Sequence, residues 1–291
     1  MTSPTRSRRG AGAAALCALL LLTGCAGGGA TKNEYADRRG ATVIGTDGSA
    51  ESRIVAALYG ALLTGAGQQV RTVTSGYTSP ADTAQAVVDG ELSLAPAYES
   101  TLLRALPGGQ TLPGNMAATL SMALPPGIVA LPPAAAQRGI VLAVTRATAR
   151  RDGLRTLADL SETDARRTLG GAASGDPDAP TPAALKKAYG VTLTAVGTSA
   201  KADVRVLRGT DPALAGEDLT VLSDPEAVVP PEHVFPLIQA PYADLSARKA
   251  LARLNSALTT AQLATLVASV EAGETPTGVA RDWLRAHGLR K

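Results

Sequence analysis

The sequence predicts an α/β fold of two lobes, in which each lobe is a mostly parallel sheet with flanking helices. Strand and helix signals alternate from Thr42 onward, a pattern typical of parallel sheets covered by helices. The alternation begins again at Gly139, which indicates a second lobe. About 250 residues follow the N-terminal segment, enough for two modest domains. The core is expected to be aliphatic, because 45% of the residues are hydrophobic and only 3% are aromatic.

The first predicted strand leads through a short turn into the first predicted helix. Residues 42–44 form an apolar run that predicts a strand, and residues 46–49 have the composition of a turn. Ser49 is placed to cap the helix, since its hydroxyl can accept a hydrogen bond from a first-turn amide. Glu51 suits the first turn, and Gly65 suits the end of the helix.

A second strand–helix unit follows the same order. Residues 70–74 predict a strand, Ser79 a helix cap and Pro80 the first helical position. Residues 92–94 predict a third strand, which leads to Tyr98.

The rest of the chain continues the alternation and ends in helices. Five prolines in residues 225–241 indicate a crossover between the lobes. The second lobe is expected to contain strands at 139–145 and 191–196 and helices at 157–160 and 182–189, and the C-terminal helices are expected at 246–258, 260–270 and 275–287.

The N-terminus resembles the leader of a bacterial lipoprotein. Three arginines precede the apolar run of residues 11–22, which is too short to span a bilayer, and Leu-Thr-Gly-Cys then ends at Cys25. The resemblance implies a signal peptide at residues 1–24 and a diacylglycerol on Cys25, with a further acyl chain such as palmitate on its amino group. Residues 25–40 would be the lipidated cysteine and a flexible tether. A chance cysteine in an ordinary cleavable signal is the alternative.

Removing residues 1–24 changes the charge of the chain. Three of its 28 basic residues lie there, so 25 remain against 25 acidic residues. No basic excess is left for nucleic-acid binding, and we expect no nucleic-acid partner. Beyond Cys25 the chain has no cysteine, and its two histidines form no cluster with metal-ligand spacing, so we expect neither a metal nor a cofactor.

Several segments, in their order and spacing, are similar to the substrate-binding proteins of osmoprotectant ABC transporters, the ProX-type binders of glycine betaine, choline and carnitine. The resemblance covers nearly all of residues 41–291. The segments that carry it are Ile44-Gly45-Thr46, Asp89-Gly90-Glu91-Leu92 with Pro96 and Tyr98, Leu124-Pro125-Pro126-Gly127, Thr210-Asp211-Pro212, Val221 to Pro225, and Leu254-Asn255 to Trp283-Leu284.

The resemblance implies a two-lobed periplasmic-binding-protein fold of type II, with the ligand cleft between the lobes. Lobe 1 would comprise residues 41–140 plus 237–291, and lobe 2 residues 141–236. The implied protein is a monomeric, lipid-anchored receptor on the extracytoplasmic face of the cell membrane. It would close on a small solute and deliver it to an ABC permease and its ATPase, without catalysis.

The sequence also leaves two other functions to consider. The same fold can serve as an envelope lipoprotein that acts as a sensor or binds a partner, without transport. A hydrolase is disfavoured, because the sequence contains no nucleophile-elbow spacing of the type Gly-x-Ser-x-Gly.

The resemblance also predicts the ligand-binding residues. Relatives surround a quaternary ammonium group with aromatic rings, and here Tyr98 alone matches such a position. Relatives often carry Phe at Ser49, Tyr at Thr83, an acid at Ala97 and Asn at His233. We therefore expect a ligand held mainly by hydrogen bonds, and the expected ligand-binding residues are Tyr98, Thr46, Asp47, Ser49, Ser79, Thr210, Asp211 and His233.

Several of these residues also have a purely structural interpretation. Ser49 and Ser79 suit helix caps, and Asp211 before Pro212 suits the start of a turn. His233 suits an exposed loop near the crossover.

Overall fold

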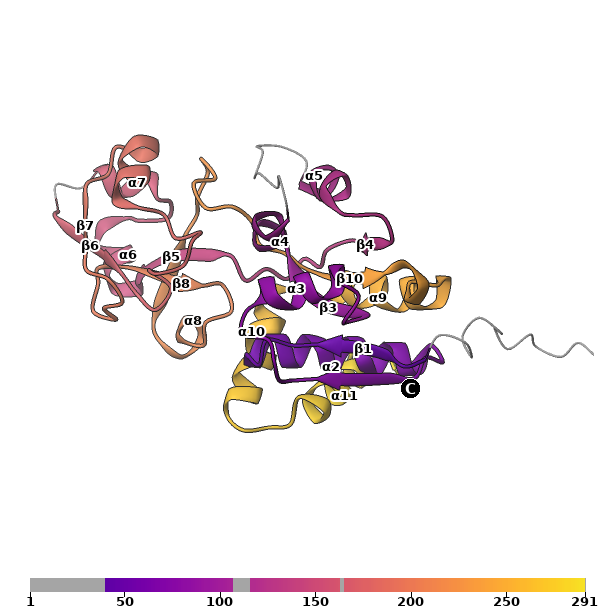
Figure 1. Ribbon diagram of the computed structural model, residues 1–291. Coiled ribbons are helices and arrows are strands. Elements are labelled where there is room, and N and C mark those ends of the chain that lie inside the picture. Colours follow the sequence, from indigo (N-terminus) through magenta and orange to yellow (C-terminus); the bar gives the residue numbers. More distant parts are fainter. Residues whose placement is uncertain (1–39, 107–115, 163–164, 291) are drawn as a thin grey trace, which may run out of the picture.

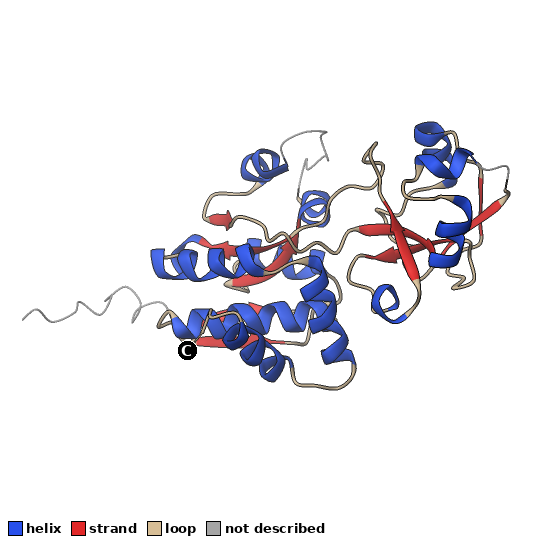
Figure 2. Cartoon of the chain, turned by 180° about the vertical axis from the view of Figure 1, so that it is seen from behind, coloured by secondary structure: helices blue, strands red, loops and turns tan. Residues whose placement is uncertain are grey.

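The computed structural model of the protein describes residues 40–106, 116–162 and 165–290 (Figure 1). It confirms an α/β fold of two lobes, each built on a five-stranded sheet with flanking helices. The strand order is β2-β1-β3-β10-β4 in the first sheet and β7-β6-β8-β5-β9 in the second. Figure 2 shows the two lobes side by side, with helices around each sheet.

The first sheet combines parallel and antiparallel strands. β1, β2 and β3 run parallel, whereas β10 runs antiparallel to both β3 and β4. β10 has this direction because it brings the chain back from the second lobe. The strands of this sheet are β1 Thr42–Gly45, β2 Val70–Val73, β3 Leu94–Tyr98, β4 Ile128–Ala130 and β10 Val234–Gln239.

The second sheet is also mixed, not mostly parallel. β6 pairs in parallel with β7 and β8, and β5 pairs antiparallel with β8 and β9. β5 is the strand that enters this lobe. The strands are β5 Ile140–Thr145, β6 Arg167–Gly170, β7 Leu193–Ala195, β8 Val204–Arg208 and β9 Leu219–Leu222.

Helices cover both faces of the first sheet. Alternate residues of β10 point to opposite faces, so Val234 and Ile238 pack with α2, α9, α10 and α11, while Phe235 and Leu237 pack with α3, α4 and α5. The helices of this lobe are α2 Ala50–Gly65, α3 Pro80–Val88, α4 Glu99–Ala105, α5 Met116–Ala123, the short η2 Ala240–Tyr242, α9 Leu245–Ala257, α10 Thr260–Glu271 and α11 Pro276–Ala286.

The second lobe has its own hydrophobic core. Leu142, Val206 and Leu185 are among its fully buried members. Its helices are α6 Arg146–Asp152, η1 Ala158–Glu162, α7 Pro182–Tyr189 and α8 Ala213–Gly216. Among the described residues, no helix is long and apolar enough to cross a membrane.

The predicted helix caps are confirmed. The Ser49 hydroxyl accepts a hydrogen bond from the amide of Ser52 at the start of α2. The Ser79 hydroxyl accepts a hydrogen bond from the amide of Asp82 at the start of α3, which has Pro80 in its first turn. The sequence could predict these helix starts because a capping hydrogen bond involves only the cap residue and the first turn of the same helix.

The third strand differs from the prediction. We expected residues 92–94, but β3 extends from Leu94 to Tyr98 and includes Pro96. Pro96 lies opposite Pro236 of β10, so neither strand needs a hydrogen bond from an amide at that pair. This pairing is non-local, and the sequence around Pro96 does not indicate it.

Two connections join the lobes and run side by side. Gln137 pairs with His233 in an isolated antiparallel bridge, and the amide of Arg138 donates to the carbonyl of Glu232 at 3.0 Å. The predicted division into residues 41–140 plus 237–291 and residues 141–236 stays a prediction. Its boundary between residues 236 and 237 falls inside β10. The signal peptide, Cys25 and the tether up to residue 39 lie outside the described residues.

We predict that Gly171→Ala destabilises the protein. Gly171 has φ +148°, and a Cβ there would lie 2.4 Å from the carbonyl oxygen of Val206 and 2.8 Å from its nitrogen. Because this neighbour is backbone in the middle of a sheet, the clash should cost about 1–3 kcal/mol or more. Thermal unfolding measures the loss. Gly175→Ala is the matched control, since its Cβ would have no neighbour within 4 Å; equal melting temperatures for both variants would contradict this account.

Candidate functional site at the junction of the lobes

A buried carboxylate links the two lobes. Glu51, in the first turn of α2, is only 8% exposed. One of its oxygens accepts a hydrogen bond from the hydroxyl of Tyr98 at 2.5 Å, and the other accepts from the hydroxyl of Thr210 at 2.6 Å. Tyr98 ends β3 of the first lobe, whereas Thr210 follows β8 of the second. Glu51 therefore holds a side chain from each lobe.

A guanidinium covers the ring of Tyr98. The central carbon of the Arg138 guanidinium lies 4.4 Å from the centroid of that ring, which is cation–π distance. Burial lowers the pKa of Arg138, but Tyr98, Glu51 and Glu232 raise it, and the net shift is upward. Burial, together with Glu51, raises the pKa of the Tyr98 hydroxyl well above its usual range. Tyr98 thus stays a neutral donor, and Arg138 stays charged.

A second buried carboxylate lies beside this pair. Glu232 is 1% exposed and accepts hydrogen bonds from the hydroxyl of Ser100 and from the amide of Thr101, the latter at 2.8 Å. Burial raises its pKa, and these two donors oppose the shift. The Ser100 hydroxyl also reaches Asp178 of the second lobe at 3.3 Å. Asp178 in turn binds Arg104 of α4 through two hydrogen bonds, which makes another contact between the lobes.

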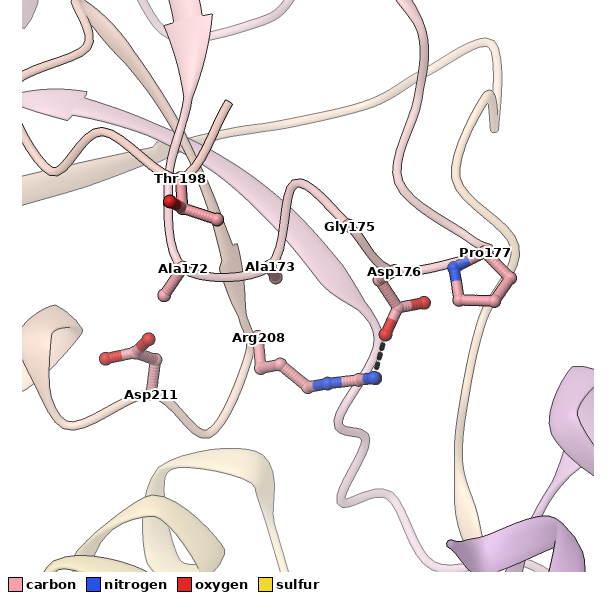
Figure 3. A pocket seen from close by; sticks show the side chains of 8 residues that line it. All are labelled: Ala172, Ala173, Gly175, Asp176, Pro177, Thr198, Arg208 and Asp211. Carbon is pink, nitrogen blue, oxygen red and sulfur yellow. Dashed lines mark hydrogen bonds and ion pairs between the residues drawn. The ribbon is translucent and has the colours of Figure 1, made fainter. Parts of the chain in front are cut away.

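A hollow of about 400 Å³ lies in the second lobe. Arg208 and Asp176 form an ion pair there, and Figure 3 shows the two side chains pointing toward each other. Burial, followed by the nearby charge of Arg138, lowers the pKa of Arg208 to about 10. The hollow is lined by Ala172, Ala173, Gly175, Asp176, Pro177, Thr198, Arg208 and Asp211 (Figure 3).

A second hollow, of about 580 Å³, belongs to the second lobe alone. It is formed by α6, the loop after it and β9, and its basic lining residues are Arg146, Arg150 and Arg155. Arg146 forms a surface ion pair with Asp218 at 3.0 Å. Like the 400 Å³ hollow, this hollow is lined by residues of the second lobe alone, but none of its lining residues adjoins Thr210, the residue that binds Glu51.

Three predicted residues form the turn that leads into α2. Thr46 is fully buried, and Asp47 accepts hydrogen bonds from the amide and hydroxyl of Ser49 at 2.9 and 2.6 Å. The turn therefore positions Glu51, which lies two residues beyond Ser49. Ser79 caps α3, and its hydrogen bond to Asp82 remains within that helix.

The other predicted residues lie at the junction or next to it. Tyr98 and Thr210 share Glu51, as described above. Asp211 accepts a hydrogen bond from the amide of Ala213 at 2.9 Å and also lines the 400 Å³ hollow. His233 approaches Glu99 with its Nδ1 at 3.0 Å, and this carboxylate raises the pKa of His233 despite partial burial. Contact with ligand stays a prediction for all eight residues.

Sequence reasoning missed four charged residues of the site: Glu51, Arg138, Arg208 and Glu232. Glu51 was interpreted only as a favourable charge at the start of a helix. Arg138 had a detectable signal, since it is the single charged residue between Leu131 and Thr145. A charge within an apolar connection between lobes indicates a buried partner.

The arrangement can bind and orient a polar solute. It offers carboxylates, guanidinium groups and hydroxyls from both lobes in a partly dehydrated space, where hydrogen bonds to charged groups are strong. Lobe closure would bring these groups onto a solute from two sides.

Comparisons with known proteins agree with this geometry. A family model described as the substrate binding domain of ABC-type glycine betaine transport system matches residues 41–286. No curated protein matches the sequence significantly.

Solved structures show the same fold. The apo form of YehZ from Escherichia coli has 20% identity and a TM-score of 0.70, over 86% of this chain and 99% of that one. A glycine betaine/carnitine/choline ABC transporter protein has 19% identity and a TM-score of 0.74, over 85% and 98%. Lactococcal OpuAC in its closed form with glycine betaine has 16% identity and a TM-score of 0.54, over 85% and 96%.

We predict that Thr210→Val weakens the contact between the lobes. Valine has nearly the shape of threonine but leaves one oxygen of Glu51 without its donor, at a cost of about 1.5–3 kcal/mol for a hydrogen bond to a charged group. Small-angle X-ray scattering should show a larger radius of gyration as the lobes separate. Thr194→Val, at an exposed position of β7, is the control; unchanged scattering by the Thr210 variant would show that Glu51 does not hold the lobes together.

Proposed function

Because the chain belongs to the family of substrate-binding domains of ABC-type glycine betaine transport systems, we propose that it captures an osmoprotectant-like solute between its lobes and delivers it to a permease. The family consists of solute-binding proteins and not of enzymes. Its members bind small solutes outside the cytoplasm and dock on a membrane permease. In this protein the solute would be a quaternary amine or a more polar or aromatic variant.

The hydrogen-bonded Glu51 is the observation that carries this proposal. Its two partners come from different lobes, so a change in the spacing of the lobes changes the contacts of a buried charge. A solute that supplies further hydrogen bonds at this junction would favour the closed arrangement over the open one. Binding would then be linked to lobe closure, as transport by a receptor and permease requires.

We further propose that Cys25 carries a lipid that keeps the protein at the extracytoplasmic face of the cell membrane. The leader before Cys25 supports this. Two or three acyl chains at one site hold a protein stably, whereas one chain binds reversibly. The protein would work as a monomer near its permease and ATPase.

We predict that Cys25→Ala abolishes lipid attachment. Cells supplied with radiolabelled palmitate should label the original protein and leave the variant unlabelled, because the acceptor thiol is gone. Cys17→Ala is the control within the same chain, since Cys17 lies in the predicted apolar part of the leader. Labelling of the Cys25 variant would refute the anchor.

A solute screen tests the proposed function. The full chain, purified in mild detergent, is heated with glycine betaine, choline, carnitine, amino acids or aromatic solutes. A solute at a hundred times its Kd should add about 2.7 kcal/mol of stability and raise the melting temperature. Glu51→Gln should reduce this shift, and Glu271→Gln, at an exposed position of α10, should not.

If every solute leaves the melting temperature unchanged, transport is contradicted. The second candidate would then be favoured, an envelope lipoprotein of the same fold that acts as a sensor or binds a partner.

A further inference from the structure

The ring of Tyr98 is held in one position with one face against a cation. Its hydroxyl is fixed by the 2.5 Å hydrogen bond to Glu51, and the side chain is only 1% exposed. The guanidinium of Arg138 lies over the ring at 4.4 Å. An aromatic face with buried carboxylates nearby has the chemistry of a cation site. Here the chain's own cation occupies it.

Arg138 is held at this place by its backbone and by electrostatic attraction. Its amide donates to the carbonyl of Glu232, and the connection from Leu131 to Gly139 continues directly into β5. Among the described residues, no carboxylate forms an ion pair with its guanidinium, and its buried Nε has no hydrogen-bond partner. The ring of Tyr98 is therefore its direct contact, with Glu51 and Glu232 as nearby counter-charges.

A guanidinium and a trimethylammonium group are both monocations with the same number of heavy atoms. A solute with a trimethylammonium head would need the same space over Tyr98. The side chain of Arg138 is tethered, so its effective concentration over the ring is far higher than that of a free solute. A solute cation must also leave water to enter, whereas Arg138 is already partly dehydrated.

We infer that Arg138 determines specificity: it fills the cation site over Tyr98 and so excludes quaternary ammonium solutes from the junction. This inference rests on the proposed function and narrows its substrate class. The protein would take polar solutes that lack a methylated ammonium head. The groups left to bind them are Thr210, Asp211 and the Arg208–Asp176 pair at the hollow of the second lobe.

The test measures choline binding to the full chain by isothermal titration calorimetry. Choline carries the trimethylammonium head and no carboxylate, so it probes the cation site alone. The original protein should bind choline only at or below the weakest affinity that the titration detects, and the gain is counted from that limit. Arg138→Ala should gain affinity for choline by about tenfold or more, because the ring and both carboxylates become accessible to a free cation.

Three further variants show whether the gain belongs to this site. Arg138→Lys keeps a tethered cation and should not bind choline. Tyr98→Leu in the Arg138→Ala background should lose the gain, because the aromatic face is gone. Arg253→Ala, on the surface of α9, is the control and should behave like the original protein. Arg138→Gln replaces Arg138→Ala if the alanine variant does not fold, as judged by its thermal unfolding.

Two results would overturn the inference. One is choline binding by the original protein that is as tight as that of the Arg138 variant, and the other is no binding by either. The solute screen separates this inference from the proposed function. If a solute binds the original protein but the Arg138 variant gains no affinity for choline, the inference fails and the proposed function stands. If the Arg138 variant gains affinity for choline but the original protein binds no solute, the proposed function fails, and only the occupation of the cation site by Arg138 stands.

Discussion

The buried carboxylate of Glu51 is the constraint on which the junction depends. A carboxylate removed from water costs several kcal/mol unless hydrogen bonds replace the lost hydration. Tyr98 supplies one such bond from the first lobe and Thr210 the other from the second. In the structure Glu51 is 8% exposed, and the hydroxyl of Thr210 replaces part of its lost hydration. Glu51 thus contributes one polar contact between the lobes, beside the contacts of Asp178 with Ser100 and Arg104.

The charges around Glu51 follow from the same requirement. Arg138, Glu232 and the Arg208–Asp176 pair are all partly or fully buried, so each needs a partner or a counter-charge. Arg138 lies over the ring of Tyr98, and Glu232 accepts hydrogen bonds from two donors at the start of α4. A junction built this way is polar, and its carboxylates already accept hydrogen bonds from the chain itself. A solute must compete with these contacts and not merely fill an apolar cage, which is why the chain's few aromatic residues do not preclude a binding function.

The features that could be predicted from the sequence are those that depend on residues close together in the chain. Ser49 and Ser79 marked helix starts correctly, and the restart at Gly139 marked the second lobe. The direction of β5 and β10 could not be predicted, because it follows from pairing between strands far apart in the chain. Glu51 was missed for the same reason: its partners lie 47 and 159 residues away. Of the eight predicted site residues, Tyr98 was matched through the family resemblance and the others were chosen for their polar groups, whereas Arg138 and Glu232 were missed because their contacts are with residues far away in the chain.

In the proposed function a solute binds between the lobes at the Glu51 junction. The most direct measurement is a crystal structure with the solute that stabilises the protein most. The solute should contact both lobes and lie within hydrogen-bond distance of Thr210 or Arg208, with Arg138 still over the ring of Tyr98. A solute bound to one lobe alone, for example in the hollow lined by Arg146, Arg150 and Arg155, would contradict it.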